Sequence, residues 1–402
     1  MSDVSRRDFV KLAAALPCAA AELAPAEGAT GSSQPPAPSP VDQNPIRRRG
    51  VGLRGLDAAR AWPGLTLFAP AGLTETFLID LHGTVVHSWK MPYRPGLYGY
   101  LTDRGTLFYN GQIPNETFLG KQPFMGGAVL EMDWNGRILW ELKRPDHHHD
   151  GRLLRNGNVI LLCGAELPDD VARRVRGGRA GSEIDRKTMW SDFIVEATTD
   201  GRVVWEWKAW EHLDPAVDAL TALQDERNEW THANSVWEDA DGSLLVSFRN
   251  ISTVVRIDRR TGNIVWKLGA PPLSGQHAPY MLANGNMLLF DNGPHRLDES
   301  FPFSRVIEIN PATKAITWKY QEPRTFNFYS PRISNAQRLP NGNTLINEGV
   351  FGRFFEVTSD GDVVWEYVNP HFGPPTAAVK AQQNGVFRVY RYSEEEVARI
   401  RR

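Results

Sequence analysis

Three histidines recur at the start of short apolar strands that each lead into a turn glycine. His149 and His277 lie eight residues before that glycine, and His232 lies ten before it, a difference that a two-residue longer turn would accommodate. Ser334 takes the same place at eight residues and Tyr98 a similar one at seven. An imidazole titrates near neutral pH, so it can move a proton, attack an electrophile or bind a metal ion. Three histidines on equivalent repeats indicate a shared reaction centre rather than packing.

The strands that carry these residues belong to hairpins with Asn-Gly or Asp-Gly turns, which are the strongest short hairpin signal in a sequence. Hairpins of a second kind alternate with them, each with an apolar strand, a tight turn and a strand that carries tryptophan. These tryptophans are Trp89, Trp140, Trp205, Trp266, Trp318 and Trp365. A large residue at one place in every repeat is what packing between repeats requires, so we interpret the tryptophans as structural.

Two hairpins make a four-stranded antiparallel sheet, and six such units predict an all-β fold, a six-bladed β-propeller. The hairpin of Trp365 has one further strand, residues 386–392, and we expect strand 65–68 to complete this sixth blade. Pairing of the N- and C-terminal strands would close the ring and remove an exposed sheet edge. Equivalent positions of successive blades are related by rotation about one axis. The histidines at the starts of these strands are therefore expected to converge on one point near that axis.

Two insertions interrupt the repeats, at residues 168–190 and 213–227. The first is polar and arginine-rich, which predicts an exposed loop or lid. The second has helical composition, with Asp214 as a cap and Pro215 at the first helical position, and predicts a helix. Both precede strands that carry candidate site residues, so we expect them to overhang the same face.

The composition excludes several classes of function. Lysine and arginine total 45 and aspartate and glutamate 47, a net charge of −2, so there is no basic footprint and we expect no nucleic-acid partner. No run of 18 apolar residues exists, which argues against a membrane-spanning helix. We find no phosphate-binding glycine loop and no nucleophile elbow, so neither a nucleotide enzyme nor a Ser-His-Asp hydrolase is indicated.

The N-terminal residues predict an export signal. Residues 5–11 match the twin-arginine pattern, so we assign a signal peptide to residues 1–26, a flexible Pro/Ser/Ala-rich linker to 27–50 and the propeller catalytic domain to 51–402. We expect the twin-arginine machinery as a partner, a periplasmic or secreted location, and no stable membrane insertion after processing. Of the two cysteines, Cys18 lies in the signal peptide, and Cys163 is expected to be a buried small hydrophobe.

Several segments together resemble the bacterial arylsulfate sulfotransferases that do not use the nucleotide sulfate donor PAPS. They are the Asp-His-His-His-Asp run at 146–150, the Trp-Thr-His-Ala-Asn-Ser-Val run at 230–236, Ser-Phe-Arg at 247–249, Gln-His-Ala at 276–278 and Phe-Asp-Asn-Gly at 290–293. The resemblance extends over roughly residues 60–395. It implies a six-bladed propeller that moves a sulfuryl group from a phenolic sulfate ester to another phenol through a sulfohistidine, in two steps.

The resemblance also implies roles for individual residues. His277 matches the nucleophile, Ser334 falls where the family has a small hydroxyl residue, and Tyr98 matches an aromatic residue that contacts substrate. The residues that match those around the transferred group are His149, His232, Asn234 and Arg249. His148 is the rival of His149 for its place. An aryl sulfate donor and a phenolic acceptor are the implied small-molecule partners, with no cofactor and no metal.

The residue types fit this chemistry in their own right. Sulfuryl transfer is an in-line displacement that places negative charge on the non-bridging oxygens, where Arg249 and Asn234 supply a cation and a hydrogen-bond donor. A neutral imidazole is a competent nucleophile, and a second one can donate a proton to the leaving phenolate. We predict that His232 handles this proton. His232 is also the rival nucleophile, and only the resemblance favours His277.

The sequence departs from the best-known family members in two respects. Only a short segment separates the linker from the first blade, so we expect the additional N-terminal β-domain of those members to be absent. Their disulfide near the site is not expected here either, because one cysteine remains after processing.

Two other functions stay open. A metal-dependent hydrolase would hold its ion with His149, His232 and His277, although Arg249 nearby would repel a cation. A non-catalytic binding module is favoured by the tryptophan-rich repeats, which resemble those of quinoprotein propellers, but it leaves the three histidines unexplained.

Overall fold

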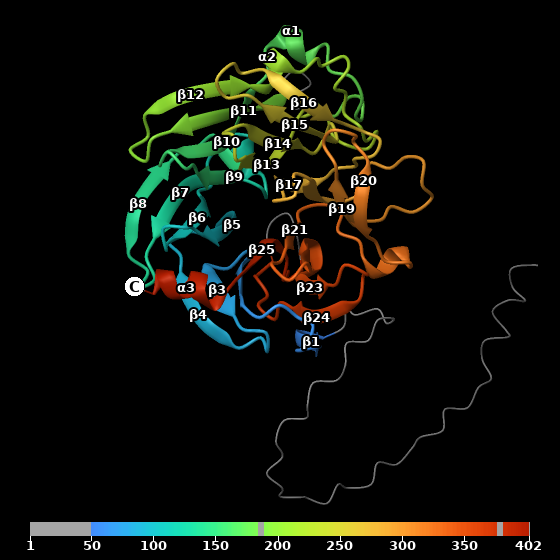
Figure 1. The fold of residues 1–402 in the computed structure, drawn as a ribbon. Helices are drawn as coiled ribbons and strands as arrows, with labels where there is room; N and C mark the ends of the chain where they lie inside the picture. The colour runs from blue at the N-terminus through green and yellow to red at the C-terminus, as the bar shows by residue number, and fades with distance from the viewer. Residues whose placement is uncertain (1–49, 184–188, 376–380, 402) are drawn as a thin grey trace, which may run out of the picture. The chain divides into compact units, whose positions relative to one another are not determined.

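The computed structural model describes residues 50–183, 189–375 and 381–401, and over these the chain forms a six-bladed β-propeller, as the sequence predicts (Figure 1). The predicted signal peptide at 1–26 and all but the last residue of the predicted linker lie outside the described residues. All strand pairs within the blades are antiparallel, and the innermost strands β5, β9, β13, β17, β21 and β25 surround the central axis.

Blades are numbered here from the N-terminal side, and the strands of each are given in chain order. Blade 1 contains β2 (Leu65–Pro70), β3 (Glu75–Ile79), β4 (Val85–Lys90) and β25 (Val386–Tyr392). Blade 2 contains β5 (Pro95–Leu101), β6 (Leu107–Gln112), β7 (Gly127–Met132) and β8 (Ile138–Lys143). Blade 3 contains β9 (His147–Leu153), β10 (Val159–Glu166), β11 (Trp190–Ala197) and β12 (Val203–Lys208).

The remaining three blades follow the same plan. Blade 4 contains β13 (Ala233–Glu238), β14 (Leu244–Phe248), β15 (Thr253–Ile257) and β16 (Ile264–Leu268). Blade 5 contains β17 (His277–Met281), β18 (Met287–Asp291), β19 (Arg305–Ile309) and β20 (Ile316–Tyr320). Blade 6 contains β21 (Asn335–Arg338), β22 (Thr344–Glu348), β23 (Arg353–Val357) and β24 (Val363–Val368), with β1 (Gly52–Leu56) as an outer fifth strand.

The ring closes through the predicted pair of terminal strands, but in a different blade from the one expected. β25 pairs with β2, with Leu65 opposite Tyr392, and together they form the inner half of blade 1. The expectation that they complete the Trp365 blade was wrong. Each Asn-Gly hairpin joins the tryptophan hairpin that follows it in the chain rather than the one before it, so blade 6 is complete and blade 1 is the one that needs a C-terminal strand.

The hydrophobic core is divided among the seams between blades. Six clusters of buried side chains occur in the described part of the chain, one at each seam. Alternation along β2 shows why: Leu67 packs towards blade 2, and its neighbour Phe68 packs towards blade 6, 5.1 Å from the Phe354 ring. Cys163 lies in one of these clusters and is fully buried, as expected.

Indole N–H groups join neighbouring blades. In five of the blades a tryptophan on the fourth strand from the central axis donates to a main-chain carbonyl of the next blade. These bonds run from Trp89 to Asp133 (3.1 Å), Trp207 to Gly262 (2.9 Å), Trp266 to Pro311 (2.8 Å), Trp318 to Ser359 (2.8 Å) and Trp365 to Leu81 (2.7 Å). The last of them links blade 6 to blade 1. Trp140 instead donates to Glu131 within its own blade. The structural role of the tryptophans therefore follows from hydrogen bonding as well as from size, and in blade 3 Trp207 takes the place expected for Trp205.

Within the described ranges, three short α-helices lie outside the blades: α1 (Asp169–Ala172), α2 (Ala209–His212) and α3 (Glu394–Ile400). Single 3₁₀ turns occur at Leu119–Lys121, Thr325–Asn327 and Gly349–Phe351. Ser393 and Glu396 form a capping box at the start of α3. None of the helices in the described ranges is long and apolar enough to cross a membrane.

The helix predicted over 213–227 is not formed, and this segment consists of turns. The two insertions pair with each other instead, through bridges from Gly177 to Leu220 and from Arg179 to Glu226. Arg227 also donates to the Gly177 carbonyl at 2.6 Å. These contacts supply the backbone partners that a helix would otherwise provide. Residues 184–188 of the first insertion lie outside the described residues.

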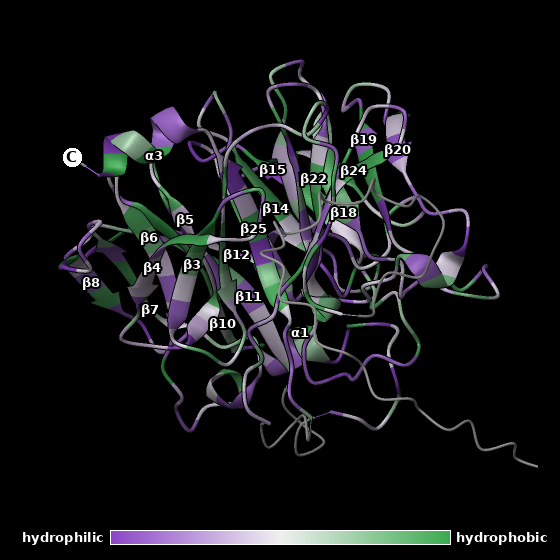
Figure 2. Ribbon diagram, turned by 90° about the horizontal axis from the view of Figure 1, so that it is seen from below, coloured by the Kyte–Doolittle hydropathy of each residue, from purple (hydrophilic) through white to green (hydrophobic). Residues whose placement is uncertain are grey.

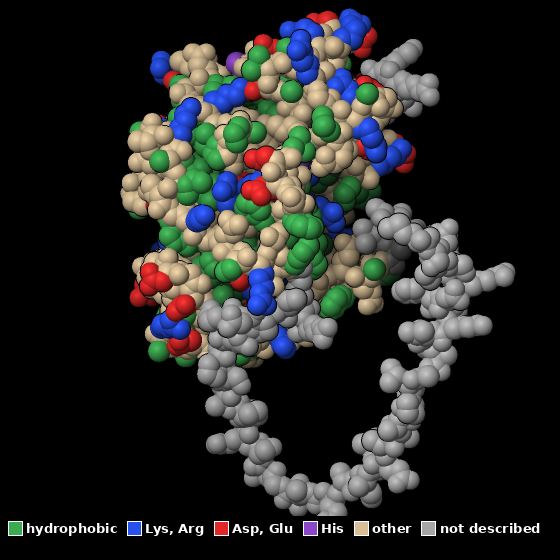
Figure 3. All heavy atoms as spheres, turned by 90° about the vertical axis from the view of Figure 1, so that its right-hand side faces the viewer, with side chains coloured by type: hydrophobic (Ala, Val, Ile, Leu, Met, Phe, Trp, Pro, Cys, Tyr) green, Lys and Arg blue, Asp and Glu red, His purple; other side chains and the backbone are tan. Residues whose placement is uncertain are grey.

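The surface is mixed in character. Hydrophobic residues gather on the strands, and hydrophilic ones are frequent on the connecting turns (Figure 2). On the side of the ring near β20, basic, acidic and hydrophobic side chains are interspersed (Figure 3). This agrees with the nearly balanced charge of the sequence.

Candidate active site

The three histidines of the repeats converge where the innermost strands of blades 3, 4 and 5 begin. His149 lies in β9, His232 immediately precedes β13, and His277 opens β17. The rings of His149 and His232 meet edge to face, with centroids 4.6 Å apart. Phe124 contacts both of these rings, also at 4.6 Å. Phe387 of β25 lies 6.2 Å from the His149 ring and 6.1 Å from the His277 ring. All three imidazoles are buried.

His232 reaches this centre by a different route from the one that its spacing suggests. In blades 4 and 5 alike, the turn glycine donates its N–H to the carbonyl three residues earlier, at 2.9 Å, so the expected longer turn in blade 4 is absent. In blade 5, His277 lies five residues before Leu282, whose carbonyl accepts this bond. The residue five positions before Asp239, which accepts the bond in blade 4, is Asn234. His232 lies two residues upstream, in the left-handed region with a φ of 53°.

The neighbours of His277 select one tautomer of its ring. Asn292 donates its Nδ2 to the carbonyls of Ser330 (2.7 Å) and Ile333 (2.8 Å), which turns its Oδ1 towards His277. That Oδ1 lies 2.8 Å from His277 Nδ1, which must therefore carry the proton. The lone pair of His277 Nε2 accepts the main-chain N–H of Ile333 at 3.1 Å. Burial, and after it the charge of Arg249, lowers the pKa of His277 well below its ordinary value, so the ring is neutral.

His148 and His149 occupy different places, with His149 at the centre and His148 behind it. The two Nδ1 atoms lie 2.7 Å apart, and His148 Nε2 lies 3.0 Å from Asp192 Oδ1. Burial by itself lowers the pKa of His148, but the contact with the Asp192 carboxylate outweighs it, and the pKa is raised. In its protonated form, which the Asp192 carboxylate favours, His148 donates to His149 Nδ1, and the proton of His149 is then on Nε2. Burial and then His232 lower the pKa of His149.

His232 is paired with a carboxyl group from the chain just before it. His232 Nδ1 lies 2.6 Å from Glu229 Oε2, and both side chains are buried. Burial raises the pKa of Glu229, and burial followed by the charge of Arg249 lowers the pKa of His232. The pair therefore favours its uncharged form and holds one proton across this hydrogen bond.

Arg249 directly follows β14, and its main-chain N–H donates to the His232 carbonyl at 2.9 Å. Its Nη1 donates to Asn250 Oδ1 at 2.8 Å and lies 3.6 Å from Asp225 Oδ2. The charge of Arg249 lowers the pKa values of both His232 and His277, second only to burial. A guanidinium so placed supplies positive charge beside two of the histidines.

The other three residues predicted for the site have contacts of their own, away from the imidazoles. Asn234 donates Nδ2 to the Gln276 carbonyl at 2.8 Å, just before His277 in the chain. The Ser334 hydroxyl donates to Ser330 and accepts the Gly349 N–H, each at 2.9 Å. These bonds position the backbone around His277, and none of them is a contact with the three rings.

Tyr98 lies in β5, the innermost strand of blade 2. Its hydroxyl donates to Asp150 Oδ1 at 2.5 Å, and its ring lies 4.3 Å from the Arg388 guanidinium. The side chain is fully buried. Its ring also lies 6.0 Å from that of Phe387, so Tyr98 adjoins the histidine group through Phe387 and Asp150.

The sequence had pointed to only part of this arrangement. The polar turn after β18 was expected to orient neighbouring groups, and Asn292 in that turn does contact His277. Glu229 and Asp192 were missed, although a glutamate three residues before His232 is a local signal. Asp225 comes from the insertion at 213–227 and reaches both Arg249 and His295, the latter at 3.0 Å.

The arrangement does not resemble a metal centre. Among the described residues, no group of three or more His, Cys, Asp and Glu side chains is disposed to hold a metal ion. A histidine whose Nδ1 contacts a neighbouring side chain could still bind a metal ion through Nε2, but the Nε2 of His277 accepts the Ile333 N–H. The described residues therefore offer no set of ligands for the alternative of a metal-dependent hydrolase.

The comparison with solved structures bears on the fold alone. A protein of unknown function from Bacteroides caccae matches with a TM-score of 0.50 and 15% identity, over 83% of this chain and 100% of that one.

Two curated relatives have a known activity. The chain is 25% identical to the arylsulfate sulfotransferase AssT of Escherichia coli over 368 residues, and 25% identical to that of Lelliottia amnigena over 366. Each match extends over 70% of this chain and 58% of the relative, so the chain spans less than two thirds of the relatives' length. The family model described as "Arylsulfotransferase (ASST)" matches residues 73–273 and 272–391, which include every candidate site residue. This chain belongs to the arylsulfotransferase family.

Proposed function

We propose that this protein transfers a sulfuryl group from an aryl sulfate to a phenol through a sulfohistidine on His277. The observation that carries the proposal is the fixed tautomer of His277, with its proton on Nδ1 towards Asn292 and its lone pair on Nε2. A buried neutral imidazole with a directed lone pair is what a nucleophile requires. Family membership and 25% identity to arylsulfate sulfotransferases support the reaction class.

In the first half-reaction, His277 Nε2 attacks the sulfur atom and the bond from sulfur to the aryl oxygen breaks. The sulfuryl group displaces the Ile333 N–H from the lone pair, which costs about 1 kcal/mol, the net value of one hydrogen bond. Negative charge on the non-bridging oxygens faces the Arg249 guanidinium, and the Nε2 proton of His149 is a second donor. The departing aryl oxygen carries the bonding electrons as a phenolate.

The phenolate takes its proton from His232. The Nε2–H of His232 is given up while the Glu229 carboxyl proton moves to His232 Nδ1 across their 2.6 Å contact. Glu229 is left ionised and His232 neutral, so no extra charge remains on the ring. The second half-reaction reverses these movements: the acceptor phenol gives its proton to His232 Nε2, its oxygen attacks sulfur, and the bond between sulfur and His277 Nε2 breaks.

The experiment uses the full chain with 4-nitrophenyl sulfate, with and without added phenol. Release of nitrophenolate that depends on phenol, together with phenyl sulfate formation, is the expected result and separates transfer from hydrolysis. With the donor alone, mass spectrometry should find one acid-labile sulfuryl adduct on the peptide that contains His277, which disappears when phenol is added.

His277→Asn tests the assignment, with His82→Asn as the matched control because His82 is an exposed histidine outside the site. The first variant should form no adduct and the second should behave as the parent protein. An adduct on a different histidine, or transfer without any adduct, would overturn the proposal. A non-catalytic propeller, the remaining alternative, predicts no nitrophenolate release from either protein.

We also propose export through the twin-arginine pathway, followed by residence in the periplasm or outside the cell. The support is the sequence of residues 5–11, with Arg6 and Arg7 as the arginine pair. Replacement of both arginines by lysine should retain the protein in the cytoplasm with its precursor mass. Export that continues in this variant would contradict the assignment.

A further inference from the structure

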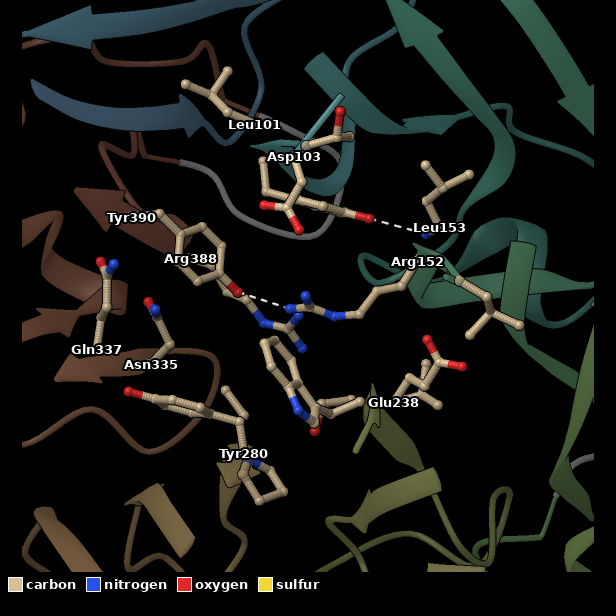
Figure 4. A pocket seen from close by; sticks show the side chains of 18 of the residues that line it. Leu101, Asp103, Arg152, Leu153, Glu238, Tyr280, Asn335, Gln337, Arg388 and Tyr390 are labelled. Carbon is tan, nitrogen blue, oxygen red and sulfur yellow. Dashed lines mark hydrogen bonds between the residues drawn. The ribbon is translucent and has the colours of Figure 1, made fainter. Parts of the chain in front are cut away.

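A cavity of about 640 Å³ lies at the end of the central channel opposite the histidines. The innermost strands begin beside the histidines and run to the hairpin turns. The cavity is lined by residues along these strands, from Ser235, Ala278 and Asn335 onwards, and by the turns of blades 2 and 3, and we name it the turn-end cavity. Figure 4 shows its interior, with the side chains of Arg152 and Arg388 reaching towards its centre and Tyr390 beside them.

Arg388 has donors without partners. Its Nη2 donates to the Asn234 carbonyl at 2.9 Å and lies 3.0 Å from Asp150 Oδ2, but Nε and Nη1 have no hydrogen-bond partner although the side chain is only 1% exposed. Arg152 donates Nη2 to the Tyr390 hydroxyl at 2.9 Å, and its buried Nε also lacks a partner. Unsatisfied donors on a buried guanidinium are costly, which indicates that an acceptor belongs there.

Positive charge exceeds negative charge around the two guanidinium groups. Asp150 is the one carboxylate in contact with Arg388, and it already accepts hydrogen bonds from the Tyr98 hydroxyl and the Val236 N–H. Arg152 Nε lies 3.9 Å from Asp150, beyond hydrogen-bond distance. Over the whole lining, five arginines face two acidic residues; the charged residues are Asp103, Arg104, Arg152, Arg155, Glu238, Arg338 and Arg388.

Aromatic rings form the walls beside these charges. The Arg152 guanidinium lies 4.7 Å from the Trp237 ring and 5.1 Å from the Tyr100 ring. Tyr280 and Tyr390 complete the aromatic lining on the other side (Figure 4). Flat apolar walls with a few convergent cationic donors suit a planar ligand that has an anionic group at one end.

We propose that the turn-end cavity is a second binding site, separate from the histidines, for a small aromatic anion such as an aryl carboxylate or aryl sulfonate. The anionic group accepts hydrogen bonds from the open donors of Arg388 and Arg152, and the ring lies against Trp237. Binding here involves no transfer step and does not depend on the proposed reaction. Arg388 lines the cavity and contacts Asp150 and the Tyr98 ring, which places it between the ligand and the strand that carries His149.

Benzenesulfonate is the probe, because its sulfur is bonded to carbon and is not transferred to the enzyme as an aryl sulfate's sulfuryl group would be. The proposed donor site beside the histidines would also accept an aryl sulfonate, so the titration uses Arg249→Gln, in which that site is weakened. Calorimetry should then show one saturable site, and a crystal structure with the probe should place a sulfonate against Arg388. Methanesulfonate, which lacks the ring, and benzyl alcohol, which lacks the charge, should each bind at least about tenfold more weakly, since each loses one class of contact.

Variants distinguish the two ends of the channel. In the Arg249→Gln background, Arg152→Gln should weaken the remaining benzenesulfonate binding about tenfold or more through loss of a charged donor at the turn-end cavity. Arg388→Gln is the stronger test where it folds, and the crystal structure decides the location where it does not. Absence of saturable binding in Arg249→Gln, binding in that variant that Arg152→Gln does not weaken, or a probe located beside His277 alone would each overturn the proposal.

Discussion

The Nε2 atom of His277 accepts a hydrogen bond from the main-chain N–H of Ile333, at 3.1 Å. Ile333 and the following Ser334 have φ values of 54° and 89°, in the left-handed region that a β-branched residue rarely adopts. The surrounding bonds hold this strained segment in place: Asn292 donates to the Ile333 carbonyl, and the Ser334 N–H donates to the Phe387 carbonyl. The backbone at the start of blade 6 thus fixes the direction of the lone pair on His277 of blade 5.

Asn292→Asp should change the pH dependence of the proposed transfer. The carboxylate still accepts the proton of His277 Nδ1, but its negative charge raises the pKa of His277, which is now held well below its ordinary value. Because attack needs the neutral ring, the acid limb of the rate profile should move to higher pH by about one unit or more. Single-turnover rates with 4-nitrophenyl sulfate between pH 4 and 8 measure this shift. An unchanged profile would remove Asn292 from the role given to it.

Arg249→Lys should slow the transfer by about a hundredfold, the usual loss when a donor to developing oxyanion charge is removed. Lysine keeps the positive charge but loses the planar fork that can contact two oxygens at once. Stability should change little, because the Arg249 side chain is 18% exposed and its Asp225 contact is 3.6 Å long. Steady-state rates and urea unfolding measure the two effects. Near-parental turnover in this variant would exclude the assigned role.

His232→Asn should discriminate between leaving groups. A nitrophenolate leaves without a proton, whereas an unsubstituted phenolate needs one, and the Glu229–His232 pair is its proposed source. The loss in rate should therefore be much larger for phenyl sulfate than for 4-nitrophenyl sulfate. Rates with a series of substituted phenyl sulfates give this dependence. Equal losses across the series would assign the proton to another group.

The fold could be predicted because its signals are local. The glycine of a hairpin turn, such as Gly285 with a φ of 81°, marks its turn within a few residues, and alternation of apolar residues marks each strand. Which hairpins join in one blade is a non-local choice, and here the sequence-based assignment failed. The pairing of β25 with β2 was predicted correctly, but nothing near either strand in the sequence tells that the pair joins β3 and β4 of blade 1 rather than the strands of blade 6.

The candidate site also contains residues that local spacing predicts and residues that it cannot predict. His149 and His277 follow the repeat, so their spacing alone brought them together. His232 does not follow it, and its position depends on a backbone turn that spacing cannot reveal. Asp192 contacts His148 from a strand of the same blade more than forty residues later in the chain, a relationship set by sheet register rather than by any motif.

Trp365→Phe should destabilise the ring at its closing seam. The Trp365 side chain is fully buried, donates to the Leu81 carbonyl of blade 1 at 2.7 Å and stacks on Arg391. Loss of this hydrogen bond and of part of the buried indole should lower the free energy of unfolding by about 2–3 kcal/mol. Trp318→Phe is the control, because the corresponding bond to Ser359 is exposed, and it should cost about 1 kcal/mol or less. Equal losses in urea unfolding would contradict the distinction between the seams.

Buried neutral histidines should make the protein less stable in mild acid, and His147 isolates this effect outside the reaction centre. Burial, followed by the charge of His148, lowers the pKa of His147 to about 3, against an ordinary value of 6.5. Below pH 6.5 the unfolded chain binds a proton at this residue and the folded chain does not. The contribution of His147 to stability is therefore complete above pH 6.5 and falls between pH 6.5 and about 3, by about 1.4 kcal/mol for each pH unit.

His147→Gln removes this one residue from the difference in proton binding between the folded and unfolded chains, while the other titrating groups remain. The Gly127 N–H loses its acceptor, now His147 Nδ1 at 3.3 Å, so the variant should be less stable than the parent protein at pH 7. The difference should then shrink as the pH falls from 6.5 to 4.5, because only the parent loses the stability that the neutral ring provides. Urea unfolding of both proteins at several pH values gives the difference directly. A difference that stays constant over this range would mean that His147 is protonated equally in the folded and unfolded chains.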